Sequence, residues 1–251
     1  MDRKWIKQNA VFITLSLMLF VALGLAVLCI PKGELHLLLC DRHTPARDIF
    51  YRYYTQIAEF LPYIICVLLL LFGRIGDAAT ATACVAGADL TTQILKHIFN
   101  APRPITWFAA NMPDVQLPLV EGVRMNHWFS FPSGHTTAFF SLFFVLSLLV
   151  TNYLTAKSSD CNSRHTAKST DSDRSHIAKH SYYTWLSGIV QVALFLLAAL
   201  GGYSRIYLSQ HFPEDVLAGI GVGLTISCLM VTLFSRWKGQ KWYNYKLFSK
   251  K

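Results

Sequence analysis

Three short motifs contain the residues of this chain that are best suited to chemistry. They combine basic side chains, two histidines and a carboxylate. The motifs are Lys96 with Arg103-Pro104 after six residues, then Pro132-Ser133-Gly134-His135, then Ser204-Arg205 with His211 and Asp215. Each motif alone is a weak signal, because basic residues often anchor helix ends and Ser or Pro begins many helices. Together they fix eleven residue identities in order, so coincidence is a poor explanation.

The basic residues of the motifs predict a site for a phosphoryl group. In transfer such a group spreads negative charge over three equatorial oxygens, so catalysis is mostly positioning and electrostatic stabilisation. Lys96, Arg103 and Arg205 supply three cations, and the two guanidinium groups suit phosphate oxygens. Ser133 and Gly134 are expected at a helix start, where free N–H groups and the helix dipole favour an anion. These five residues are the predicted phosphate-binding set.

The motifs resemble the signature of the type-2 phosphatidic acid phosphatase superfamily, which also includes the vanadium haloperoxidases and glucose-6-phosphatase. Every signature position is matched, over nearly half of the chain from Lys96 to Asp215. The resemblance implies a phosphohydrolase that works through a phosphohistidine intermediate, without a metal ion or cofactor. No carboxylate pair suited to Mg²⁺ occurs among the motif residues, which is consistent with a metal-free site.

Catalytic roles are expected for His211, Asp215 and His135. His211 has to be neutral to attack phosphorus, and Asp215 can hold its other ring nitrogen and stabilise the developing charge. By resemblance, and because the other histidines are less well placed, His135 is expected to act as general acid on the leaving oxygen. It would then serve as base for the water of the second step.

The composition indicates a lipid environment. Hydrophobic residues make up 53% of the chain, charged residues 15%, and the mean hydropathy is +0.36. A soluble domain usually carries about a quarter charged residues. A net charge of +9 is compatible with binding to nucleic acid, but here the basic residues fall at the ends of apolar stretches. We therefore expect no nucleic-acid partner.

Six stretches are predicted to cross the membrane, each close to the roughly 20 residues that a helix needs. They are residues 11–30, 55–73, 77–95, 129–153, 183–203 and 216–235. The second stretch contains Glu59 and Pro62, and the third contains Asp89 among many small residues, so these two are the least apolar. In the sixth, Gly219 and Gly223 have a spacing that predicts close packing against another helix.

The predicted fold class is all-α: a polytopic membrane helical bundle with six transmembrane helices and a short interfacial helix after the first. Thr44-Pro45 indicates the start of that interfacial helix, and aromatic residues around Arg52 suit the headgroup level. Residues 1–251 are expected to form one integral-membrane phosphatase domain. Within it we predict a flexible cytoplasmic loop at about 154–182 and a basic cytoplasmic tail at 236–251.

The distribution of basic residues predicts the orientation. With the N-terminus inside, fifteen of the 23 Lys and Arg residues lie in inner segments. The first motif ends the third stretch, the second opens the fourth, and the third joins the fifth to the sixth. All motifs therefore meet at the outer face. We expect an integral protein of the bacterial inner membrane, with cytoplasmic termini and a periplasm-facing active site. An ER membrane facing the lumen fits the same topology.

The leading functional prediction is hydrolysis of a phosphate monoester or diphosphate on a membrane lipid. Phosphatidylglycerophosphate, phosphatidate, lipid A and polyprenyl diphosphate are all plausible substrates, with selectivity expected in residues 105–127. A lipid phosphotransferase using the same intermediate is an alternative. A transporter is a weaker one, because the polar residues gather at one face and do not thread the bilayer.

Two features are left open by the sequence. Asp89 lies seven residues before Lys96, hence on the same helical face two turns deeper, where it serves either function or packing. Cys29 and Cys40 both lie near the outer face, so a disulfide between them is conceivable. The oligomeric state is not indicated.

Overall fold

The computed structural model describes residues 4–40, 42–163 and 173–248, and every regular element in these ranges is a helix. The helices are α1 (Lys4–Gln8), α2 (Ala10–Cys29), α3 (Lys32–Cys40), α4 (Pro45–Tyr54), α5 (Ile57–Phe72), α6 (Ile75–Phe99), α7 (Pro104–Asn111), α8 (Gly134–Ser163), α9 (Asp173–Tyr207) and α10 (Pro213–Ser235). The predicted all-α class is confirmed for the described part of the chain.

Five stretches in the described ranges are long and apolar enough to cross a membrane. They are Ala10–Cys29, Pro45–Phe72, Gly134–Ser158, Tyr182–Tyr207 and Pro213–Ser235. The third predicted span corresponds to α6, which forms the expected helix but falls short in hydropathy. Its two aspartates and its many Ala, Gly and Thr residues account for this. Because α6 packs against α5, α8 and α10, it still runs within the bundle.

The centre of the bundle is α8, the most buried of the apolar helices. Its Phe140 and Phe144 are fully buried, and Phe12 of α2 meets Phe144 edge to face with 6.0 Å between ring centroids. Against α8 lies α10. A Cβ at Gly219 or Gly223 would stand 2.8 Å from a backbone oxygen of the α8 segment, so only glycine allows this approach. The predicted close packing at these glycines is confirmed.

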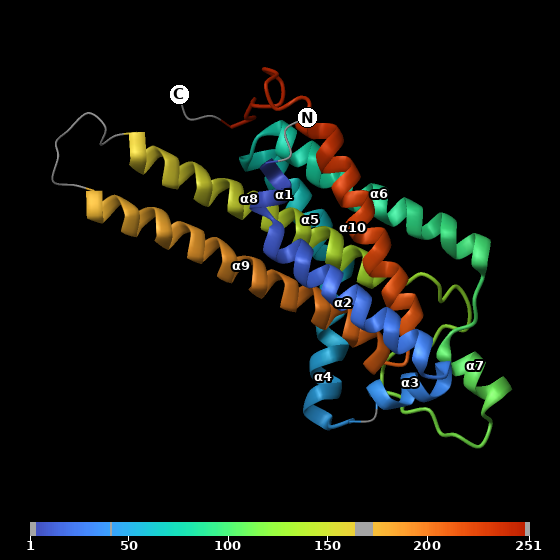
Figure 1. Ribbon diagram of the computed structural model, residues 1–251. Coiled ribbons are helices and arrows are strands. Elements are labelled where there is room, and N and C mark those ends of the chain that lie inside the picture. Colours follow the sequence, from blue (N-terminus) through green and yellow to red (C-terminus); the bar gives the residue numbers. More distant parts are fainter. Residues whose placement is uncertain (1–3, 41, 164–172, 249–251) are drawn as a thin grey trace.

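The bundle has two distinct ends (Figure 1). The helix α1 and the residues after α10 lie at one end, whereas α3, α4 and α7 lie at the other. At that second end α6 and α9 finish and α8 and α10 begin, so the three sequence motifs share one side of the molecule.

The long helices extend further than the sequence suggested. The predicted loop at 154–182 is too wide, since α8 continues to Ser163 and α9 already begins at Asp173. A formed helix gains one hydrogen bond for each added residue, so polar residues can prolong it. Residues 164–172, the middle of that predicted loop, lie outside the described residues.

The connections at the motif end are more helical than predicted. The helix α4 begins at the expected place, where the Thr44 side chain accepts from the Arg47 N–H at 3.4 Å. Only residues 55–56 separate it from α5. The short α3 was not predicted. Cys29, just before it, is exposed and forms no disulfide.

Candidate active site

The first motif is held by the turn between α6 and α7. Asn100 adopts a left-handed conformation with φ 39°, and its N–H donates to the Lys96 carbonyl at 2.9 Å. The Arg103 guanidinium donates from Nε to the Trp128 carbonyl at 3.0 Å and from Nη1 to the Gln210 side chain at 3.1 Å. Burial lowers the pKa of Arg103 from its usual value, although the side chain remains a cation at neutral pH.

The second motif forms the N-terminus of α8. The Ser133 hydroxyl accepts from the N–H of Thr136 at 3.4 Å and from its hydroxyl at 2.9 Å, so it caps the helix. Its own hydrogen is then available to a ligand oxygen. A Cβ at Gly134 would lie only 3.6 Å from the Lys96 Nζ, which places that ammonium beside the helix start. These groups can bind an anion together.

The third motif lies in the turn between α9 and α10. Ser209 is left-handed with φ 51°, and the N–H groups of Gln210 and His211 both donate to the Arg205 carbonyl, at 3.0 and 3.1 Å. The Arg205 side chain is buried, and its Nη1 donates to Thr55 Oγ1 at 2.7 Å. Its Nε has no hydrogen-bond partner among the residues that the structure describes. This turn ties the arginine directly to the neighbouring histidine.

His211 is supported by a serine as well as by the expected aspartate. Its Nδ1 lies 3.5 Å from Asp215 Oδ2 and 3.5 Å from Ser130 Oγ, while the Ser130 hydroxyl donates to Asp215 Oδ2 at 2.5 Å. The Phe212 N–H also donates to that oxygen, at 2.8 Å. Burial, followed by the charge of Arg103, lowers the pKa of His211 well below its usual value. This lowered pKa favours the neutral imidazole, the form that the predicted nucleophile requires.

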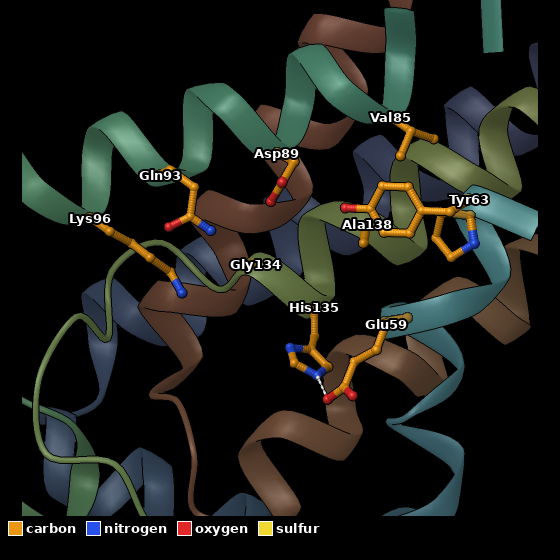
Figure 2. A pocket seen from close by; sticks show the side chains of 11 residues that line it. Glu59, Tyr63, Val85, Asp89, Gln93, Lys96, Gly134, His135 and Ala138 are labelled. Atoms are coloured by element: carbon orange, nitrogen blue, oxygen red, sulfur yellow. Dashed lines mark hydrogen bonds and ion pairs between the residues drawn. The ribbon is translucent and has the colours of Figure 1, made fainter. Parts of the chain in front are cut away.

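His135 separates two cavities at this end of the bundle. Its Nε2 lies 3.2 Å from Oε1 of Glu59, a residue of α5 (Figure 2). One cavity, of about 220 Å³, is also lined by Lys96, Gly134 and Asp89. The other, of about 340 Å³, is lined on its far side by Arg205 and Gln210, among others. The His135–Glu59 pair lines both.

All eight predicted site residues gather at this end. Four of them line the two cavities: Lys96, Gly134, His135 and Arg205. The other four are buried and line neither of these cavities: Arg103, Ser133, His211 and Asp215. Lys96, Arg103 and Arg205 act electrostatically on both histidines. Within the described ranges none of these three cations has a carboxylate within 4.0 Å, so their charge is available to an anionic ligand. The described residues contain no cluster of three His, Cys, Asp or Glu side chains suited to a metal.

Four further residues touch the site without belonging to a motif: Ser130, Thr55, Glu59 and Gln210. Glu59 gave a partial signal, as a carboxylate within an apolar stretch. The other three are ordinary polar residues, and only the packing of the helices brings them to the histidines and arginines.

The described part of the chain is a helical bundle that carries a histidine, three cations and a helix N-terminus at one end. These features define a class of protein: helical membrane proteins with a site suited to a phosphoryl group. Residues 77–238 match the PAP2 superfamily, which is more than half of the chain, so the chain belongs to that superfamily. The resemblance seen in the sequence motifs is confirmed.

The similarity to individual proteins is lower, between 20% and 28% identity. The chain is 28% identical over 157 residues to a lipid A 4′-phosphatase of Porphyromonas gingivalis, a match that covers 60% of this chain and 49% of that protein. The fold is similar to the crystal structure of Aquifex aeolicus LpxE, with a TM-score of 0.54, 24% identity and coverage of 79% and 93%. It is also similar to a transmembrane PAP2-type phosphatidylglycerolphosphate phosphatase from Bacillus subtilis, with a TM-score of 0.57, 20% identity and coverage of 93% and 99%.

Proposed function

We propose that this protein is a lipid phosphatase that hydrolyses a phosphate monoester or diphosphate on a membrane lipid. One observation carries the proposal: the buried imidazole of His211, whose pKa burial lowers, lies among three cations that have no carboxylate partner within the described ranges. Such a site suits a phosphoryl group that is attacked by nitrogen. The names of the relatives in Porphyromonas and Bacillus, a lipid A phosphatase and a phosphatidylglycerolphosphate phosphatase, support the same class of reaction.

The proposed reaction has two steps. First, the free ring nitrogen of His211, Nε2, attacks phosphorus, the bond to the leaving oxygen breaks, and that oxygen takes a proton from His135. Second, the oxygen of a water molecule attacks phosphorus, gives a proton to His135, and the phosphorus–nitrogen bond breaks. Lys96, Arg103, Arg205 and the α8 N-terminus would stabilise the charge on the phosphoryl oxygens in both steps.

A lipid is the favoured substrate because the site is continuous with an apolar groove. The groove, of about 650 Å³, runs between α5 and α6 and shares Tyr63 and Val85 with the cavity beside His135. Its remaining lining is mostly aliphatic. A substrate chain in this groove would bring its phosphate to Lys96 from within the bilayer, so a free sugar phosphate would leave the groove empty.

The second cavity supports a headgroup larger than phosphate. Arg52 and Arg124 line it in addition to Arg205, and no ion pair joins either of them to a carboxylate in the described ranges. Phosphatidylglycerophosphate, lipid A and polyprenyl diphosphate carry a further anionic group that these arginines would favour. Phosphatidate, without such a group, remains a candidate through the first cavity.

The proposed setting is the bacterial inner membrane. In this arrangement α6 completes six spans with the five apolar stretches, α4 lies at the headgroup level, and the site faces the periplasm. The separation of α1 and residues 236–248 from the end that holds α3, α4 and α7 supports it (Figure 1), as does the excess of basic residues in the inner segments.

Release of phosphate from a panel of lipid phosphates in detergent tests the proposal. We expect activity that survives EDTA, is inhibited by vanadate and disappears in His211→Ala. Loss of activity on chelation would contradict a metal-free mechanism. Full activity of His211→Ala would contradict the nucleophile assignment.

A further inference from the structure

The junction between α4 and α5, residues 55–59, places two polar side chains against two different signature residues. Thr55 Oγ1 accepts from Arg205 Nη1 at 2.7 Å, and Glu59 Oε1 lies 3.2 Å from His135 Nε2. Thr55 and Glu59 are four residues apart, so they lie one helical turn from each other on the same face. Neither belongs to the three motifs. One turn of chain therefore contacts both His135, the proton donor of the proposed reaction, and Arg205, one of its phosphate-binding cations.

The contact with Glu59 fixes the roles of the two nitrogens of His135. An ionised carboxylate can only accept hydrogen bonds, so the hydrogen of this contact is on Nε2. Nδ1 then remains for the leaving oxygen, and it faces the side of the cavity where Lys96 lies (Figure 2). A carboxylate on the far nitrogen also stabilises the ring when it is protonated. Asp215 stands in a comparable relation to His211.

The contact with Thr55 orients Arg205 without neutralising it. Arg205 is 6% exposed, and no carboxylate in the described ranges lies within 4.0 Å of its guanidinium. A neutral hydroxyl acceptor holds the planar group in place and leaves its positive charge for the substrate. A carboxylate at the same position would compete with the phosphate for that charge.

We propose that Glu59 and Thr55 are positioning residues for the reaction, acting through His135 and Arg205 respectively. The inference rests on the proposed function. In the first step the proton moves from His135 to the leaving oxygen, and in the second it returns to His135 from water. Glu59 stays a carboxylate throughout and supports the protonated ring. Thr55 keeps Arg205 directed at the phosphoryl oxygens in both steps.

The exposure of the pair argues against a role in stability alone. The side chain of Glu59 is 49% exposed and that of His135 26%. Exposed ion pairs contribute little to folding, because water screens the charges and two side chains lose freedom. Glu59→Gln keeps the shape of the side chain, so this variant is expected to fold, and its effect on turnover can be measured directly.

The dependence on the leaving group tests Glu59. An alkoxide leaving group needs a proton from His135, whereas p-nitrophenolate leaves readily without one. With the full chain in detergent, Glu59→Gln should lower kcat/KM roughly tenfold for an alkyl phosphate lipid but less than about twofold for p-nitrophenyl phosphate. Asp89→Asn is the matched control, since Asp89 lines the same cavity. An equal loss on both esters, or the same selectivity in Asp89→Asn, would overturn the role.

Thr55→Val should lower the activity on both esters alike, because Thr55 acts through Arg205, which contacts the phosphoryl group. Both esters carry the same phosphoryl group, so kcat/KM should fall by a similar factor on each, roughly three- to tenfold. Vanadate inhibition should weaken in parallel. Thr80→Val is the control, because Thr80 is equally buried but bonds Gly76 at the other end of α6. A change in the ratio of the two esters, or unchanged kinetics, would overturn this role.

Failure of the lipid phosphatase assignment can be distinguished from failure of the roles proposed for Thr55 and Glu59. A wild-type chain that hydrolyses neither ester would overturn the lipid phosphatase assignment and this inference with it. A wild-type chain that hydrolyses both, with variants that lack the two patterns, would overturn only the roles of Thr55 and Glu59. Activity of Glu59→Gln on p-nitrophenyl phosphate also reports that the variant is folded.

Discussion

Replacing Ser130 by alanine removes the hydroxyl that links Asp215 to His211. Ser130 is 1% exposed and donates to Asp215 Oδ2 at 2.5 Å, so no water is expected to replace it. The Phe212 N–H, at 2.8 Å, would remain as the other donor to that oxygen. A hydrogen bond to a buried charge is worth about 1.5–3 kcal/mol. If the whole of this free energy stabilises the transition state, its loss should lower kcat/KM by roughly one to two orders of magnitude.

Phosphate release in detergent measures the loss of activity, and thermal unfolding in detergent measures the loss of stability. Ser141→Ala is the matched control, because Ser141 is equally buried and accepts from the Ser227 hydroxyl at 3.0 Å, deeper in the bundle. The control should lose about 1 kcal/mol of stability and no activity. Wild-type kcat/KM in Ser130→Ala, or equal losses of activity in both variants, would refute the reasoning.

Two further predictions concern stability. Burial lowers the pKa of His36 to about 4, below its usual 6.5, so between these values the unfolded chain binds more protons. Stability present above pH 6.5 should therefore fall by about 3 kcal/mol as the pH drops to 4, and unfolding curves of His36→Phe should lack this slope. Gly219→Ala places a Cβ 2.8 Å from the Ser133 carbonyl, which should cost about 1–3 kcal/mol in denaturant unfolding. An unchanged midpoint would contradict the close packing.

The site residues that could be predicted are those whose identity and spacing are set by chemistry. His211 and Asp215 sit in one short motif, and the alternation of spans brings that motif to the same side as Arg103. Ser130 could not be predicted in this way. It is one serine among many, and it meets Asp215 only because α8 and α10 begin beside each other.

The helices, too, divide into those that the sequence predicts and those that depend on contacts elsewhere in the fold. Apolar stretches predicted the long helices, because length and hydropathy are properties of the segment itself. The short α3 and the polar ends of α8 and α9 depend instead on contacts and on continuation of an existing helix. Glu59 lies between these cases: its presence in an apolar stretch is visible in the sequence, but its partner His135 is set by how α5 packs on α8.

The backbone joins the proposed nucleophile and the anion-binding helix start into one piece, whereas the side chain that contacts the proposed proton donor, His135, comes from a different helix. The Ser133 N–H donates to the Asp215 carbonyl at 2.9 Å, which locks the beginnings of α8 and α10 together. The contact that orients His135 comes from α5, which also walls the apolar groove. A lipid tail that pushes α5 aside would thus disturb proton transfer before it disturbs the attacking nitrogen.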